Sequence, residues 1–247
     1  MSLPARQLRA RAGEDLIVER LGRVPYREAW ALQRALVERH HRDRSTPDTV
    51  LLVEHPDVYT LGRRADRANV LLDELRLAQR GIEVVEVDRG GDVTWHGPGQ
   101  LVVYPILRLA GTRAVVEHVR ALEAVVLDVL ERLGIAGDRV PGRSGVWVEG
   151  EKIAAVGVRV DAGGVTSHGL ALNVDPDPAG FAGIVPCGIA DAGVTSLARL
   201  GLAVGLEEVE VLMVDALGRV LEGRARTMTP AGPLALVPAR RSAGAAP

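Results

Sequence analysis

Residues 145–174 read GVWVEGEKIAAVGVRVDAGGVTSHGLALNV, three apolar runs separated by two short turns. The runs at 146–149, 152–160 and 165–174 are rich in β-branched residues, and Gly150 and the Asp-Ala-Gly-Gly segment at 161–164 join them. Strands joined by such tight turns predict an antiparallel meander. Because helical periodicity is confined to other parts of the chain, we expect an α+β fold rather than a doubly wound parallel sheet.

The segments on either side of the meander supply the helices and the remaining strands. Apolar residues recur at helical spacing in four segments, 26–44, 71–80, 112–133 and 206–223. Further strands are expected at 16–21, 50–53, 58–61, 82–87 and 101–106. Thr112 is the expected N-cap of its helix, and His40 and His41 are expected to face solvent. We predict a flexible lead-in at 1–15, one domain over 1–228, and a disordered, Pro-, Ala- and Gly-rich tail at 229–247.

The composition bounds the class of protein. With 247 residues, 47% of them hydrophobic, the chain can bury the core of one large domain, with room for a small second sheet. The net charge of −2 gives no general attraction to nucleic acid or to anionic lipid. No apolar run is long enough for a membrane span, and the first residues do not resemble a secretion signal. We therefore expect a cytoplasmic protein.

A glycine-rich stretch precedes the strand at 101–106. It reads RGGDVTWHGPGQLVVY over residues 89–104, and we interpret it as a binding loop between two strands. Its glycines allow a substrate to approach backbone amides, while the polar and aromatic side chains remain as contacts. The alternative is a glycine-rich hairpin connection with a surface histidine.

Two residue types occur once each. Lys152 stands against 29 arginines, and Cys187 is the sole cysteine. Arginine keeps its proton, so the position that stayed lysine is a candidate for an amine that must lose one. A lone cysteine is either a small buried apolar residue, which the count alone favours, or a reactive thiol.

Four strings together resemble one family. Arg-Gly-Gly, Thr-aromatic-His and Gly-Gln occur in order in the glycine-rich stretch, and Glu-His-Pro-Asp-Val-Tyr-Thr-Leu-Gly-Arg precedes them at 54–63. Gly-x-Lys-Ile-Ala-Ala-x-Gly follows at 150–157, and Pro-Cys-Gly-Ile at 186–189. This chain resembles the lipoyl(octanoyl) transferase family over roughly residues 54–197. Members move an octanoyl group from acyl carrier protein to a lysine of lipoyl domains.

The resemblance implies a fold, a site and partners. The fold is a mixed, largely antiparallel sheet packed with helices, related to the biotin and lipoate ligases. Cys187 would carry an acyl thioester and Lys152 would activate it. The implied acceptors are lipoyl domains of 2-oxoacid dehydrogenase and glycine cleavage proteins, with no cofactor and no metal. The implied substrate-binding residues are Arg89, Gly90, Gly91, Asp92, Val93, Thr94, Trp95, His96, Ala155, Val156, Gly157, His168, Gly169 and Leu170.

The chemistry of the pair fits a transfer between a thioester and an amine. A thiol with a pKa of about 8.5 is mostly protonated at neutral pH, and a nearby ammonium favours its thiolate. Once neutral, the same lysine can accept a proton from the incoming amine. His96 would either polarise the thioester carbonyl or make a structural hydrogen bond. Arg63 and Arg64 would either face a phosphopantetheine or an acidic carrier, or form a solvated turn.

Two other functions compete with this one. An ATP-dependent lipoate or biotin ligase of related fold would need an adenylate site, and no phosphate-binding glycine motif is evident. A non-catalytic acyl-binding or carrier-docking module would use the glycines only to hold a ligand. The cysteine favours the transferase, because an adenylate mechanism needs no covalent enzyme intermediate.

Overall fold

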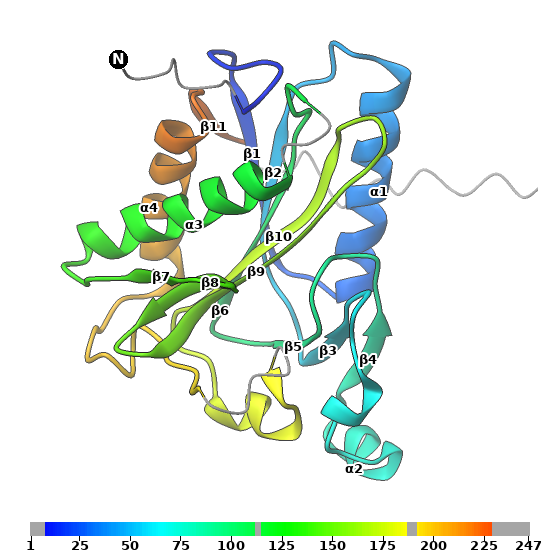
Figure 1. Ribbon diagram of the computed structural model, residues 1–247, viewed down its shortest axis with the longest axis vertical. Helices are drawn as coiled ribbons and strands as arrows, with labels where there is room; N and C mark the ends of the chain where they lie inside the picture. Colours follow the sequence, from blue (N-terminus) through cyan, green and yellow to red (C-terminus); the bar gives the residue numbers. More distant parts are fainter. Residues whose placement is uncertain (1–7, 112–114, 187–191, 229–247) are drawn as a thin grey trace, which may run out of the picture.

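An eight-stranded mixed sheet forms the centre of the protein (Figure 1). The computed structural model describes residues 8–111, 115–186 and 192–228. Three neighbouring strands at one edge of the sheet run parallel, and every other pair of neighbours is antiparallel. This confirms the predicted α+β fold with a largely antiparallel sheet. In spatial order the strands are β11 (Ala225–Met228), β1 (Leu16–Arg23), β2 (Thr49–Glu54), β6 (Gln100–Ile106), β10 (Thr166–Asn173), β9 (Glu151–Val160), β8 (Arg143–Val148) and β7 (Asp138–Val140).

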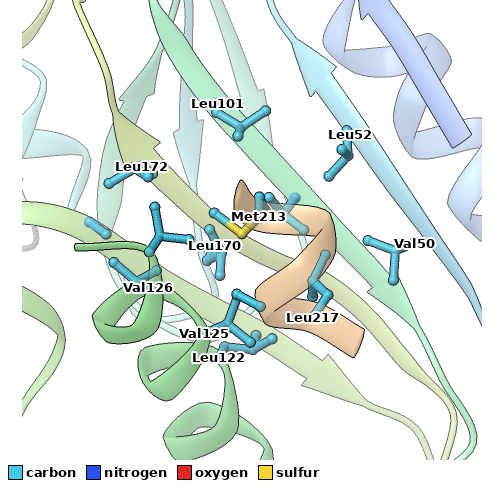
Figure 2. Packing of buried hydrophobic residues seen from close by; sticks show 14 of the residues in the cluster. Val50, Leu52, Leu101, Leu122, Val125, Val126, Leu170, Leu172, Met213 and Leu217 are labelled. Carbon is cyan, nitrogen blue, oxygen red and sulfur yellow. The ribbon is translucent and has the colours of Figure 1, made fainter. Parts of the chain in front are cut away.

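Helices cover both faces of this sheet. Alternate residues of a strand face opposite sides, so Val50 and Leu52 of β2 pack beneath α3 (Val115–Arg132) and α4 (Leu206–Val220) (Figure 2). Leu51 and Val53 of the same strand pack against α1 (Tyr26–Arg42) instead. The two apolar layers fix which side chains each strand presents to either side. No helix within the described ranges has the length and apolar character that crossing a bilayer requires.

A second, three-stranded sheet lies beside the large one. Its strands are β4 (Glu83–Glu86), β3 (Val58–Leu61) and β5 (Val93–His96), in that order. The interpretation of residues 89–100 as a loop is wrong at β5, which pairs antiparallel with β3. The physical reason is a two-residue alternation: Val93 and Trp95 are buried in a small apolar cluster with α2 (Glu74–Gln79), while the intervening residues face away from it.

The N-terminal segment is not a flexible lead-in from residue 8 onward. Arg9 is 1% exposed, and its Nε donates to Asp48 Oδ2 at 2.7 Å while Nη1 donates to the carbonyl of Leu221 at 3.0 Å. The buried ion pair with Asp48 joins the segment to the residue before β2, and the bond to Leu221 joins it to the end of α4. His40, expected in solvent, is buried as well.

Several short elements were not predicted. They are β7, β11 and the 3₁₀ helices η1 (Arg67–Asn69) and η2 (Pro178–Gly183). The helix predicted over 71–80 is shorter, because Asp73 caps its start by accepting from the amide of Arg76. The predicted cap Thr112, the nucleophile Cys187 and the tail from residue 229 lie outside the described residues.

Candidate functional site

A cavity of about 420 Å³ lies between the large sheet and the glycine-rich segment. One side, here called the sheet wall, is formed by β9, β10 and β6. The other side, the loop wall, is formed by residues 89–92 and by β5, with Arg64 beside them. All predicted substrate-binding residues line the cavity except Val93 and Trp95, whose side chains are buried in the cluster with α2. Three segments that are distant in sequence are thus brought together.

The sheet wall is set by strand register. Ala155 pairs with Ala171, and Gly157 pairs with Gly169, so small residues stand opposite each other on β9 and β10. A Cβ atom on Gly169 would lie 2.0 Å from the carbonyl oxygen of Val103 on β6. Glycine is therefore required there for close approach of two backbones. A Cβ atom on Gly157 would lie 3.1 Å from the carbonyl oxygen of Gly90, so this glycine lets the loop wall approach the sheet wall closely.

The loop wall is held by backbone and side-chain bonds. β5 pairs with β3, and the amides of Arg63 and Arg64 donate to the carbonyls of Arg89 and Gly91 at 3.0 and 3.1 Å. Arg89 Nη2 donates to the carbonyl oxygen and to Oγ1 of Thr60, at 2.7 and 2.8 Å. Asp92 accepts from Asn69 Nδ2 at 2.7 Å and from the amide of Val93 at 2.7 Å. A single backbone bond, from the amide of Gly90 to the carbonyl of Val158 at 2.9 Å, joins this wall to β9.

Histidine and tyrosine side chains form the inner end of the cavity. Tyr104, which lines it, lies 2.8 Å through its hydroxyl from His55 Nε2, and His55 Nδ1 lies 2.7 Å from the carbonyl of Val24. Burial lowers the pKa of His55 to about 4 and that of His96 to about 3, and it raises the pKa of Tyr26 to about 12. These groups are uncharged at neutral pH.

His168 is held differently from the other histidines of the cavity. It lies within β10 with φ +58, a left-handed conformation unusual for a residue with a side chain. Gln33 accepts from its backbone amide at 2.8 Å, and its Nε2 lies 2.8 Å from Asp88 Oδ1. Burial lowers the pKa of His168, while Asp88 acts in the opposite direction. Burial outweighs the carboxylate, so the pKa of His168 lies below its ordinary value.

Sequence reasoning did not find several residues that line the cavity or support its histidines and tyrosines. Tyr26, Asp88 and Gln33 come from segments with no recognisable motif, and His55 alone was weak evidence. No local pattern identifies Tyr26, Asp88 and Gln33, because each acquires its role through contacts across the fold, whereas His55 lies in the string at 54–63 that resembles the family. Tyr104 was within the quoted stretch without a role, and Gln100 was expected there as a polar contact for the substrate.

Lys152 lines the cavity from the start of β9 and is 8% exposed. Its Nζ lies 4.8 Å from the centre of the Trp147 ring, a distance at which a cation and a ring attract. It also borders an adjoining cavity of about 20 Å³ that Pro186 and Val194 line. The backbone of Lys152 bonds to both Gly193 and Thr195. Residues on either side of the undescribed 187–191 segment are therefore near Lys152.

Metal binding finds no support in the described part of the chain, where no three His, Cys, Asp or Glu side chains are grouped to hold an ion. The predictions of no metal and no cofactor stay predictions.

Solved structures define the class of fold first. A lipoate-protein ligase A bound with ATP matches with a TM-score of 0.69 and 16% identity, covering 88% of this chain and 89% of that chain. A chain from an archaeal lipoylation system of Thermoplasma acidophilum, with a bipartite lipoate protein ligase and its E2 lipoyl domain, matches with a TM-score of 0.66 and 16% identity. It covers 88% of this chain and 87% of that chain. The fold is thus the one found in lipoate-protein ligases.

Sequence comparison then gives the family. The model of the lipoyl protein ligase A/B catalytic domain matches residues 25–218, and this chain belongs to that family. An octanoyltransferase of Chloroflexus aggregans is 49% identical over 213 residues, 85% of this chain and 96% of the relative. An octanoyltransferase of Mycobacterium marinum is 50% identical over 222 residues, 86% and 90% respectively. The family predicted from the motifs is confirmed.

Proposed function

We propose that this protein transfers an octanoyl or lipoyl group from acyl carrier protein to a specific lysine of lipoyl domains, within protein lipoylation. Octanoyl transfer is the activity named for relatives about half identical over most of their length. The acceptors would be lipoyl domains of 2-oxoacid dehydrogenase and glycine cleavage proteins. Residues 1–228 would form one catalytic domain, and the cytoplasmic location stays a prediction.

One observation carries the proposal: the sole lysine lines the cavity and also borders a small adjoining cavity, which is lined by Pro186 and Val194 from either side of the segment of the sole cysteine. In the first half reaction, the Cys187 thiolate attacks the donor thioester and releases the carrier thiol. In the second, the acceptor amine attacks the acyl-enzyme and the Cys187 thiol is regenerated. Lys152 would favour the thiolate first and accept the proton of the amine afterwards.

The walls fit a linear acyl chain with a polar end. The sheet wall contributes Ala155 and Ala171, whose short side chains leave room, and Val102 and Leu170, which are apolar. Lys152 and the polar residues of the loop wall stand at other positions of the same cavity. We therefore propose Arg89–His96, Ala155–Gly157 and His168–Leu170 as the substrate-binding segments, with Val93 and Trp95 acting through their backbone alone.

The test is an intact-mass measurement with octanoyl carrier protein as the only other component. The wild-type protein should gain one octanoyl group, and hydroxylamine should remove it because it is a thioester. Cys187→Ala should gain none. A wild type that gains nothing, or a variant that gains as much as the wild type, contradicts the acyl-enzyme.

Addition of an acceptor lipoyl domain then separates the competing functions. Transfer without ATP supports the transferase. Transfer that requires ATP and free octanoate would identify a ligase, and binding of octanoyl carrier protein without transfer would identify a non-catalytic module.

A further inference from the structure

A directed series of hydrogen bonds connects His96 to the segment that follows the proposed nucleophile. His96 Nδ1 lies 2.7 Å from Gln100 Oε1, and Gln100 Nε2 lies 2.9 Å from Asn173 Oδ1. Asn173 Nδ2 donates to the carbonyl oxygen of Thr195 at 2.9 Å. His96, Gln100, Asn173 and Thr195 are all buried.

The direction of every bond follows from the last one. The Thr195 carbonyl can only accept, so the amide nitrogen of Asn173 must face it and the amide oxygen must face Gln100. Gln100 therefore donates to Asn173 and presents its own oxygen to His96. A hydrogen on His96 Nδ1 completes the series. A neutral imidazole carries one hydrogen, so Nε2 of His96 has a lone pair and no hydrogen.

The ring is also fixed in orientation. Tyr26 stacks on it with centroids 5.9 Å apart and planes 12° apart, and His55 contacts it edge-on at 6.0 Å. His96 lines the main cavity. Nε2 makes no hydrogen bond to any side chain or backbone group of the described residues. A buried ring held on one nitrogen and both flanks thus has its second nitrogen available to a ligand.

We propose that His96 Nε2 accepts a hydrogen bond from the amine of the acceptor lysine and orients it for attack; this inference rests on the proposed octanoyl transfer. The thioester carbonyl and sulfur carry no hydrogen and cannot donate to this nitrogen. A neutral amine carries two, and donating one to Nε2 directs its lone pair away from the ring. His96 does not polarise the carbonyl, because that role needs a donor. Gln100 and Asn173 are positioning residues that act through His96.

Nitrogen NMR tests the tautomer directly. Long-range ¹H–¹⁵N spectra of the histidine rings separate protonated from unprotonated nitrogens, and His96→Gln assigns the ring. Wild-type His96 should show hydrogen on Nδ1 only. His55, whose Nδ1 faces the carbonyl of Val24, should show the same pattern and serves as the internal reference.

Removal of the acceptor side chain should change that pattern. Gln100→Met leaves Nδ1 without its acceptor, so His96 should populate the tautomer with hydrogen on Nε2. Gln33→Met is the matched control, because Gln33 is also a buried glutamine but bonds the amide of His168. In Gln33→Met the His96 tautomer should be unchanged.

Kinetics test the role. In His96→Leu, attack by the acceptor lysine on preformed acyl-enzyme should slow about tenfold more than acyl loading, as expected for one hydrogen bond. His96→Gln, which can present an oxygen, should recover part of the rate, and Gln100→Met should show the loss that its tautomer shift predicts. Loading and transfer slowed equally in His96→Leu would overturn the role.

The inference and the proposed function fail separately. A wild-type protein that transfers octanoyl but carries hydrogen on His96 Nε2 overturns the inference alone. A wild-type protein with the expected tautomer that does not transfer octanoyl overturns the proposed function, and with it the amine as the ligand of His96.

Discussion

The two walls of the cavity are built by different kinds of interaction. The sheet wall is a continuous antiparallel ladder in which Gly157 pairs with Gly169 between two apolar layers. The loop wall belongs to the small sheet, through the pairing of β5 with β3, and side-chain bonds from Arg89 and Asp92 complete it. One backbone bond, from Gly90 to Val158, joins it to β9 of the large sheet. We infer that the first wall sets the shape of the cavity, whereas the second can adjust its contacts with little effect on the core.

The largest expected effect is at Lys152, on the sheet wall. Lys152→Arg keeps a positive charge, so acyl loading of Cys187 should be largely preserved. Arginine cannot accept the proton of the incoming amine, so discharge of the acyl-enzyme should slow by about 10² to 10⁴, the range for loss of a general base. Single-turnover measurement of both half reactions checks this prediction.

The control for Lys152→Arg is a variant of Trp147, the ring that Lys152 contacts. Trp147→Phe removes the indole beneath Lys152 but keeps an aromatic ring, so discharge should slow much less than in Lys152→Arg. Equal, near-wild-type rates for both halves in Lys152→Arg would show that Lys152 is not the base.

The second-largest expected effect is that acid destabilises the loop wall more than the sheet wall. Burial lowers the pKa of His96, on the loop wall, from 6.5 to about 3, with His55, Arg89 and His168 adding to the effect. A folded-state pKa below the unfolded value gives stability that is present above pH 6.5 and lost as the pH falls toward 3. Each pH unit in that window costs about 1.4 kcal/mol for one such histidine. On the sheet wall, burial also lowers the pKa of His168, but the Asp88 carboxylate opposes that shift, so the loss of stability in acid should be smaller there.

Hydrogen exchange between pH 7 and 5 measures this difference. The amides of β5 should lose protection before those of β10, and His96→Gln should reduce the difference. Simultaneous loss of protection in both strands would mean that the walls open as one unit.

The sheet wall could be predicted from the sequence because its signals are local. Alternation and β-branched residues located the ends of β9 and β10 to within one residue, since pairing and burial act on each residue of such a strand. Gly91, Gly97 and the other glycines suggested a loop where β5 forms. Two apolar residues in a four-residue strand are too short a pattern to outweigh them.

The site was predictable only where a motif marked it. The strings around Lys152 and His96 identified segments that the fold does bring together at one cavity. Gln100, the direct partner of His96, lies in the same motif, but the other contacts that determine the chemistry of His96 come from Tyr26, Asn173 and Thr195, which are far away in the chain. Such partners are defined by tertiary structure, and a single sequence contains no local signal for them.

A pair of glycine substitutions compares the tolerance of the walls. In Gly169→Ala the new Cβ would meet the Val103 carbonyl, so backbone must shift, at a cost of about 1–3 kcal/mol. In Gly90→Ala the nearest atom, the carbonyl oxygen of Val158, is at 3.4 Å, an ordinary contact. Its cost should stay within about 0.5 kcal/mol. Chemical denaturation of both variants decides, and equal losses would contradict the comparison.

The smallest expected effect concerns Asp92, which ties the loop wall to η1. Asp92→Ala removes the acceptor of Asn69 Nδ2 and of the Val93 amide, so the wall should become less ordered before the donor binds. Because one such bond contributes about 1 kcal/mol, KM for octanoyl carrier protein should rise about fivefold, with little change in Tm. Asp66→Ala is the control, because that side chain only caps η1 and its backbone amide still reaches Asp92. A Tm loss in Asp92→Ala as large as that of Gly169→Ala, with KM unchanged, would place the loop wall in the rigid frame of the protein.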